Sequence, residues 1–209
     1  MKIYLVIYFI LLFLSLVTGV FNLKKDVSFK YIVALISLSI VTEIGNLFTN
    51  QHKTGSYIWY HFFTPIEYCL LTFYFLSYFH KKIIRYCIIV SQLIFILFCA
   101  FVSINLGLYE EYPSYLVIVE VFLILFWAFF HLFNIKPKLD TTIFNESFFW
   151  IDVGLVFYFS GIFFIDGVLK CIISSNRLES LQIYHTIFNC IFNYILYIFI
   201  IIGFSAKKR

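Results

Sequence analysis

The side chains most able to do chemistry in this 209-residue chain are acids, histidines and amides that lie inside long apolar stretches. They are Glu43, Glu67, Glu120, Asp152, Asp166, His61, His131, His185, Asn46, Gln92, Asn189 and Asn193. Groups of these types carry protons, bind cations or small solutes, or form hydrogen bonds between helices. No Lys or Arg lies deep among them, because Arg85 can extend its charge toward the end of its segment. Desolvation without a cation favours the neutral acid, so we expect some of these carboxyls to be protonated at pH 7.

The spacing of these groups places several of them on shared helix faces. Glu43 and Asn46 stand at i and i+3, and His185, Asn189 and Asn193 stand at i, i+4 and i+8. We therefore expect an outward-facing polar pocket formed by Glu43, Asn46, His61, Glu67, Glu120, Asp166, His185, Asn189 and Asn193. The alternative is a structural role, in which each hydrogen bond between helices contributes about 0.6 kcal/mol. The amides fit that alternative better, whereas five acids without matching cations fit a functional site better.

Two glycines and one proline indicate where helices pack closely or bend. Gly154 and Gly161 are seven residues apart on one face, where small residues let two backbones approach. Pro65 follows His61 by four residues, and it should kink its helix and free a backbone carbonyl. We expect the glycines to serve packing rather than ligand binding, and the kink to help line a cavity.

The elements that must position these groups follow from the composition. Apolar residues make up 63% of the chain and charged residues 12%, and the mean hydropathy is +0.97. A soluble domain is about one quarter charged, so this composition excludes a soluble enzyme. The apolar runs are long and do not alternate, which favours transmembrane helices of about 20 residues over a barrel. The sequence predicts seven such helices, at Ile3–Phe21, Tyr31–Phe48, Tyr57–Phe79, Ile83–Ile104, Pro113–Phe133, Phe148–Leu169 and Gln182–Phe204.

The basic residues divide unevenly between the two sides of such a bundle. Eleven of the fifteen fall on one side: Lys24, Lys25, Lys30, Lys81, Lys82, Arg85, Lys136, Lys138, Lys207, Lys208 and Arg209. The other side holds Lys2, Lys53, Lys170 and Arg177. Because Lys and Arg concentrate in cytoplasmic loops, we expect the amino terminus outside and the carboxyl terminus in the cytoplasm.

The alternative for the first segment is a signal peptide cleaved near Val17-Thr18-Gly19. Cleavage would leave Lys24, Lys25 and Lys30 outside and would put every later loop on the wrong side. We therefore expect a retained first helix. The net charge of +4 is then explained by cytoplasmic loops beside anionic lipid, without direct nucleic-acid binding.

Several membrane chemistries lack their residues in this sequence. A retinal protein needs a lysine in its last helix, and Gln182–Phe204 contains none. The zinc-binding pair of histidines four residues apart and the serine elbow are also missing. The five cysteines show no paired spacing of a zinc or redox site. We expect no catalytic residue, no metal site and no cofactor.

One partial match concerns a class of membrane enzymes. His185 and Asn189 resemble the last element of the glutamate-type intramembrane proteases, and Glu110-Glu111 resembles their paired glutamates. In those proteases an arginine follows five positions after the first glutamate, where this chain has Tyr115, and the middle Phe-xxx-His element is missing. The protease remains the least favoured of the functions considered.

A broader resemblance covers nearly the whole chain and rests on residues of the second, third, sixth and seventh segments. These are Thr42, Glu43, Asn46, Pro65, Glu67, Tyr68, Phe149, Trp150, Gly154, Tyr158, Ser160, Gly161, His185, Asn189, Asn193, Ile202, Gly203 and Phe204. Their order resembles a family of small, uncharacterised seven-pass membrane proteins abundant in Bacteroidota, whose members often look like accessory genes beside sensor kinases. The chain is also similar in size, phenylalanine content and pass number to the membrane accessory proteins of type VI-B CRISPR loci. These resemblances imply that the protein modulates a sensor kinase or an RNA-guided RNA nuclease.

The sequence thus predicts an all-α integral membrane bundle, with residues 1–209 forming a single polytopic domain in the bacterial inner membrane. We expect a sensory or regulatory protein whose basic cytoplasmic loops contact a protein partner, and a homo-oligomer is compatible with this interpretation. The alternative is a transporter or channel for a proton, a cation or a small solute, with Glu43, Glu67 and Glu120 along its pathway.

Overall fold

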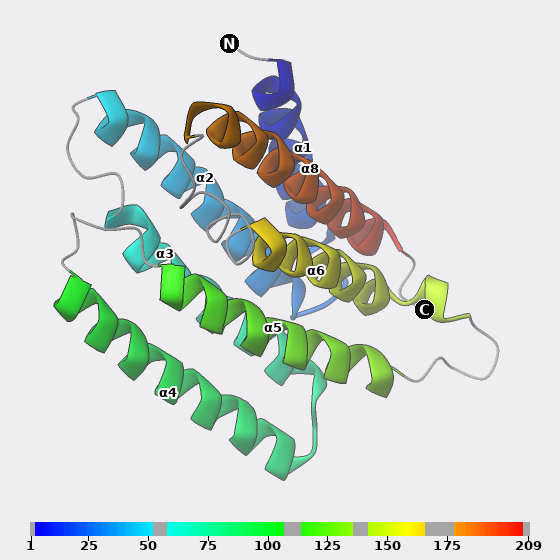
Figure 1. Cartoon of the computed structure of the whole chain (residues 1–209). Helices are drawn as coiled ribbons and strands as arrows, with labels where there is room; N and C mark the ends of the chain where they lie inside the picture. The colour runs from blue at the N-terminus through cyan, green and yellow to red at the C-terminus, as the bar shows by residue number, and fades with distance from the viewer. Residues whose placement is uncertain (1–2, 52–57, 107–113, 136–141, 166–177, 207–209) are drawn as a thin grey trace. The chain divides into compact units, whose positions relative to one another are not determined.

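The computed structural model describes residues 3–51, 58–106, 114–135, 142–165 and 178–206, and none of these is in a β-strand. Helices account for nearly all of them (Figure 1). The helices are α1 (Ile3–Asn22), α2 (Phe29–Gln51), α3 (Ile58–Tyr78), α4 (Lys82–Leu106), α5 (Ser114–Asn134), η1 (Ile143–Asn145), α6 (Ser147–Phe163) and α8 (Leu178–Ser205). The prediction of an all-α protein is therefore confirmed for the described residues. Each of the seven predicted apolar segments coincides with one α-helix, although the described part of α6 ends earlier than predicted.

Five of the described helices contain a stretch long and apolar enough to cross a membrane. These stretches are Ile3–Asn22, Phe29–Asn46, Lys82–Asn105, Tyr115–Asn134 and Ile187–Ser205. The described part of α6 is apolar but has only 17 residues. Helix α3 is long enough, with 21 residues, but its inner face carries His61, Thr64, Glu67 and Thr72 and lowers its mean hydropathy. The chain is thus a membrane protein by the length and composition of its helices.

The distribution of side chains is the reverse of that in a soluble protein. On α4, Ile83, Leu97 and Ile104 are 78%, 71% and 82% exposed, so its outer face is apolar along its whole length. The buried polar set includes acids, histidines and amides, whereas every Lys and Arg among the described residues is exposed. A continuous apolar surface of this extent requires lipid rather than water around it.

Two compact units group the helices. The central unit comprises Asp26–Glu120, with α2, α3, α4 and the first turns of α5. The terminal unit comprises Met1–Lys25 and Val121–Arg209, with α1, the rest of α5, η1, α6 and α8. The expectation of one polytopic domain stays a prediction.

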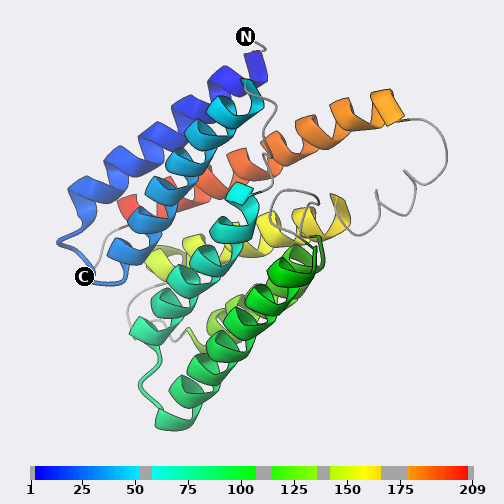
Figure 2. The same cartoon turned by 90° about the vertical axis from the view of Figure 1, so that its left-hand side faces the viewer.

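In the central unit each helix runs antiparallel to the next one along the chain. Helices α3 and α4 lie side by side in Figure 2. Along them Tyr68 packs on Phe95, with 4.5 Å between ring centroids, and Arg85 bonds back to the carbonyl of Leu76. The Tyr68 hydroxyl also lies 3.0 Å from Ser91 Oγ. Since Ser91 donates its own proton to the carbonyl of Ile88, Tyr68 is the donor to Ser91.

Helices α2 and α3 approach closely at a glycine. A Cβ at Gly45 would fall onto the indole ring of Trp59, so only glycine lets the ring lie flat against the α2 backbone. At the other end of the pair Tyr31 stacks on Phe73 at 5.7 Å. These two contacts fix the antiparallel register of α2 and α3.

In the terminal unit α6 packs against α8 through glycines (Figure 1). A Cβ at Gly154 would lie 2.8 Å from Cβ of Phe199, and one at Gly161 would fall on the ring of Phe192. Gly203 of α8 lies in the same way against Ser147 and Ile151. Gly154 and Gly161 thus both lie against side chains of α8, as their predicted packing role requires, and that role stays a prediction.

Helix α1 runs parallel to α8, and their contacts follow the same order along both helices. The Tyr194 hydroxyl donates to the carbonyl of Tyr4. Tyr8 packs on Tyr197 at 5.9 Å. Beyond the end of α1, Lys25 Nζ donates to the carbonyl of Phe204 at 3.2 Å. The carboxyl ends of the first and last helices therefore lie on the same side of the terminal unit.

Candidate functional site

A pair of acids lies inside the central unit. Glu67 of α3 and Glu120 of α5 are 7% and 2% exposed, and the two carboxyl groups are close enough to interact electrostatically. Glu67 belongs to the inner face of α3, together with Thr64 and Leu71 at i−3 and i+4. Glu120 continues the buried face of α5 that begins at Leu116. Both acids are thus held by the same helix faces that build the core.

The immediate surroundings of the acid pair contain thiols but no buried cation. Cys69 of α3 interacts electrostatically with Glu120. Cys99 of α4 interacts electrostatically with Cys69 and with Glu120. Oxygen Oε1 of Glu120 is fully buried and has no hydrogen-bonding partner within the described ranges. A buried polar atom without a partner is costly, and it is common where a proton, an ion or a ligand completes a site.

His61 lies on the same helix as Glu67, nearer the amino end of α3. It is buried, and its Nδ1 lies 2.9 Å from Oγ of Ser103 on α4. Pro65 lies inside α3 and has no N–H to give to the carbonyl of His61. The predicted kink at Pro65 stays a prediction, while the helix itself continues through the proline.

Helix α2 contributes the remaining predicted residues of the central unit. Asn46 is buried and Glu43 is partly buried, and both interact with neighbours in the structure. Five of the nine predicted pocket residues, Glu43, Asn46, His61, Glu67 and Glu120, therefore belong to one unit, and all are buried or partly buried there.

The predicted stripe on the last helix lies in the terminal unit. Asn193 Nδ2 donates to Oδ1 and to the backbone carbonyl of Asn189, both at 2.9 Å. This bonding within one helix satisfies the two amides and supports their structural interpretation. His185 lies in α8, but its side chain is outside the described part of the structure, and so are Asp166 and the Glu110-Glu111 pair.

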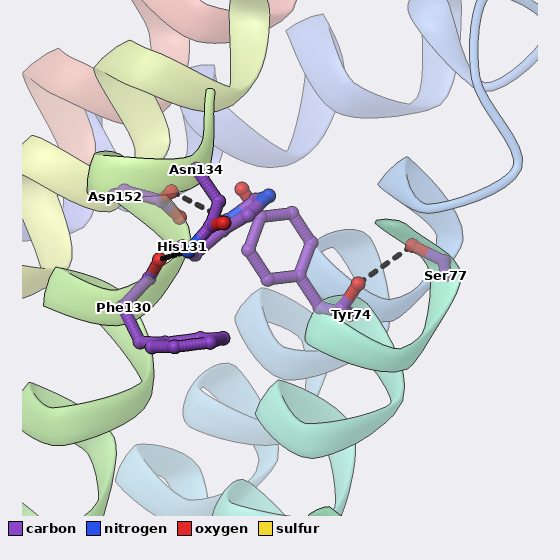
Figure 3. Close-up of polar contacts among 6 residues, drawn as sticks. All are labelled: Tyr74, Ser77, Phe130, His131, Asn134 and Asp152. Atoms are coloured by element: carbon purple, nitrogen blue, oxygen red, sulfur yellow. Dashed lines mark hydrogen bonds and ion pairs between the residues drawn. The ribbon is translucent and has the colours of Figure 1, made fainter. Parts of the chain in front are cut away.

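A third buried acid, Asp152, and its partner His131 were both outside the predicted pocket. Asp152 of α6 and His131 of α5 form an ion pair with 2.5 Å between Oδ2 and Nδ1 (Figure 3). His131 also packs edge-on against Phe148. The sequence analysis names both residues among the polar groups inside the apolar segments, but it does not pair them. The signal for this particular pair is that both residues lie near the connected ends of two consecutive antiparallel segments.

The described residues contain no cluster of three or more His, Cys, Asp or Glu side chains able to hold a metal ion. A buried pair of carboxyls can bind and release a proton or a weakly held cation. Comparisons with protein-family models, with curated proteins and with solved structures find no match to this chain.

Proposed function

We propose that this protein is a sensory or regulatory protein of the bacterial inner membrane in which a buried pair of acids responds to a signal from the outer side. The observation that carries the proposal is the approach of Glu67 and Glu120 from two different helices, both buried. Two neighbouring carboxyls without a cation favour a shared proton or a bound cation over two full charges. A change in that occupancy alters the free energy with which α3 packs on its neighbours, as a two-state switch requires.

The groups that face this pair are compatible with a proton switch. The titratable neighbours of the acid pair are the thiols of Cys69 and Cys99. His61 lies on α3 with Glu67, at the outer end of that helix in the proposed orientation. No Lys or Arg is buried among the described residues, so none of these residues supplies a fixed cation that would hold the pair in one state.

The proposed topology has seven membrane passes, with the amino terminus outside and the carboxyl terminus in the cytoplasm. The parallel contact between α1 and α8 supports an odd number of passes, because helices of opposite direction alternate between them. Lys24 and Lys25 follow α1, and Lys207, Lys208 and Arg209 follow α8. The positive-inside rule assigns that shared side to the cytoplasm.

We further propose that the basic cytoplasmic loops bind a protein partner, which responds to the state of the acid pair. The resemblances in the sequence suggest a sensor kinase or an RNA-guided RNA nuclease. Co-purification of the protein with the products of its neighbouring genes would test this partner, and recovery should depend on Lys81 and Lys82, which are exposed at the start of α4.

The fluorescence of Trp59, whose ring packs on Gly45 between α2 and α3, measures the proposed change in packing. In a Trp127→Phe, Trp150→Phe background the fluorescence of Trp59 should change in a pH titration of the protein in proteoliposomes. Glu67→Gln should remove that transition. Glu146→Gln, the same change at an acid before α6, should leave it intact. A transition of unchanged midpoint and amplitude in Glu67→Gln would contradict the proposal.

The second candidate is a proton or cation transporter, favoured by the same pair because membrane-embedded carboxyls on adjacent helices line many ion pathways. Proton or cation flux into proteoliposomes separates the two functions. Flux that is lost in Glu67→Gln and kept in Glu146→Gln would support transport. A fluorescence transition without flux would support regulation.

A further inference from the structure

The central unit contains a groove of about 480 Å³ that is separate from the acid pair. It lies between α2, α3 and α4 and is lined by Tyr31, Phe73, Leu76, Ser77, Arg85, Ile89 and Gln92. The lining residues of α3 are spaced i, i+3 and i+4, and those of α4 are spaced i, i+4 and i+7. The groove therefore follows one face of each of these two helices.

Arg85 gives the groove a positive charge and N–H donors that are available to a ligand. Its Nη1 donates to the carbonyls of Leu76 and Phe79 at 2.9 and 3.3 Å, which satisfies the last turn of α3. A guanidinium carries five N–H groups, and those on Nε and Nη2 have no acceptor within the described ranges. No acidic side chain lines the groove.

Gln92 supplies a second, independent indication of a ligand. It lies two turns along α4 from Arg85 and is only 9% exposed. Its amide makes no hydrogen bond to any residue that the structure describes, although it lines the groove. Because this amide faces the groove without a partner among the described residues, a ligand that forms a hydrogen bond with it would be favoured.

The walls of the groove are apolar and open toward the surface. Phe73 and Ile89 are exposed, and the ring of Tyr31 stacks on Phe73. Lys30 Nζ lies 4.8 Å from the centroid of the Tyr31 ring and adds a second positive charge near the groove. A suitable ligand therefore has an anionic end, a polar middle and an apolar chain.

We propose that this groove binds an anionic glycerophospholipid. The phosphate bonds to the free N–H groups of Arg85, a glycerol ester or headgroup hydroxyl bonds to the amide of Gln92, and an acyl chain lies against Phe73 and Ile89. Seven residues separate Arg85 from Gln92, so they stand about 10 Å apart along the helix axis, which suits an elongated ligand better than a compact ion. This site is independent of the acid pair and of the function proposed for it.

The test measures binding of phosphatidylglycerol and phosphatidylcholine to the purified full-length protein in detergent by native mass spectrometry. We expect preference for phosphatidylglycerol. Arg85→Gln should weaken its binding about tenfold, since a hydrogen bond to a charged group is lost. Gln92→Leu should weaken it about threefold, since a neutral hydrogen bond is lost. Lys82→Gln removes an exposed charge three residues from Arg85 and outside the groove, and it should leave binding unchanged.

Arg85→Gln could unwind the end of α3, whose carbonyls Arg85 binds, so Gln92→Leu provides a second test of lipid binding. The amide has no partner to lose, so this variant should unfold at the same temperature as the wild type or higher while it binds less lipid. Equal binding of the two lipids would overturn the proposal. So would loss of binding in Lys82→Gln as large as in Arg85→Gln, or unchanged binding in Gln92→Leu. Displacement of the lipid by millimolar inorganic phosphate would assign the site to a free anion instead.

Discussion

His131 Nδ1 lies 2.5 Å from Asp152 Oδ2, and neither side chain is exposed. The pair joins α5 to α6 inside the terminal unit, where the rings of Phe122 and Phe163 form a second contact between the same helices. An acid buried in this apolar unit is thus compensated by an imidazole rather than by a lysine or an arginine.

Removing one member of this pair should destabilise the protein strongly. We expect Asp152→Leu or His131→Leu to cost about 3–5 kcal/mol, because each leaves a buried polar group without its partner. The double variant should recover part of that loss, since both polar groups are then replaced by apolar ones. Denaturant unfolding in detergent micelles measures all three.

Asn134→Ala is the control for this prediction. Asn134 is exposed and lies one turn after His131 (Figure 3). Its Nδ2 donates a hydrogen bond of 2.7 Å to the carbonyl of Phe130 in the same helix. Its removal should change the free energy of unfolding by at most about 0.5 kcal/mol. A loss as large as that of Asp152→Leu would mean that α5 is sensitive to any change at this end.

Gly154→Ala should loosen the contact between α6 and α8. The new methyl group would meet Cβ of Phe199 at 2.8 Å, and that atom is fixed to its backbone. We expect a net loss of about 1–3 kcal/mol from overpacking, in spite of the better helix propensity of alanine. Gly161→Ala should cost at least as much, because its methyl group would fall on Cγ of Phe192, an atom that ring rotation does not move. Thermal unfolding in detergent checks both, and Ser160→Ala on the exposed face of α6 should be neutral.

The acid pair should contain a neutral carboxyl at pH 7. We expect an infrared carbonyl-stretch band of a protonated acid in the wild type, weakened in Glu67→Gln and in Glu120→Gln. The physical reason is that two neighbouring buried carboxyls without a cation do not both ionise. Glu146→Gln, which changes an acid outside the helices, should keep the band. A spectrum with only ionised carboxylates would contradict this expectation.

Cysteine labelling should place the loops after α1 and α2 on opposite sides of the membrane. In a variant without the exposed Cys87, Lys53→Cys should react with an impermeant reagent from outside, and Lys24→Cys only after the membrane is opened. Lys24 is preferred over Lys25, which bonds to Phe204. Labelling of Lys24→Cys in sealed cells would reverse the proposed orientation.

The sequence predicts the helices far better than it predicts their contacts. Length and hydropathy locate each apolar segment within a few residues, because a chain in lipid must satisfy its backbone bonds within helices. The same hydropathy carries little information about which face of a helix is inside, since both faces are apolar. The position of His131 opposite Asp152 depends on the rotation of α5 and α6, which only side-chain packing determines.

The acid pair could be predicted more fully than the groove beside Arg85. Glu67 and Glu120 are costly in an apolar segment wherever they point, so their presence alone indicates an interior position. Arg85 lies in the first turn of α4, where the sequence gives no sign that the guanidinium turns back onto α3. Tyr31, from a third helix, completes the groove only after α2 has packed.

The contact of α1 with α8 has a consequence for biogenesis. Of the two helices in this contact, α1 is synthesised before the central unit and α8 after it, whereas the central unit is one continuous stretch of chain. Residues Asp26–Glu120 can therefore pack while translation continues, but α1 must remain in the bilayer without its partner until α8 has been synthesised. An insertase or chaperone that shields a single apolar helix during that interval would act on α1. Early release of α1 would leave the face of α8 that contacts Tyr4 and Tyr8 uncovered.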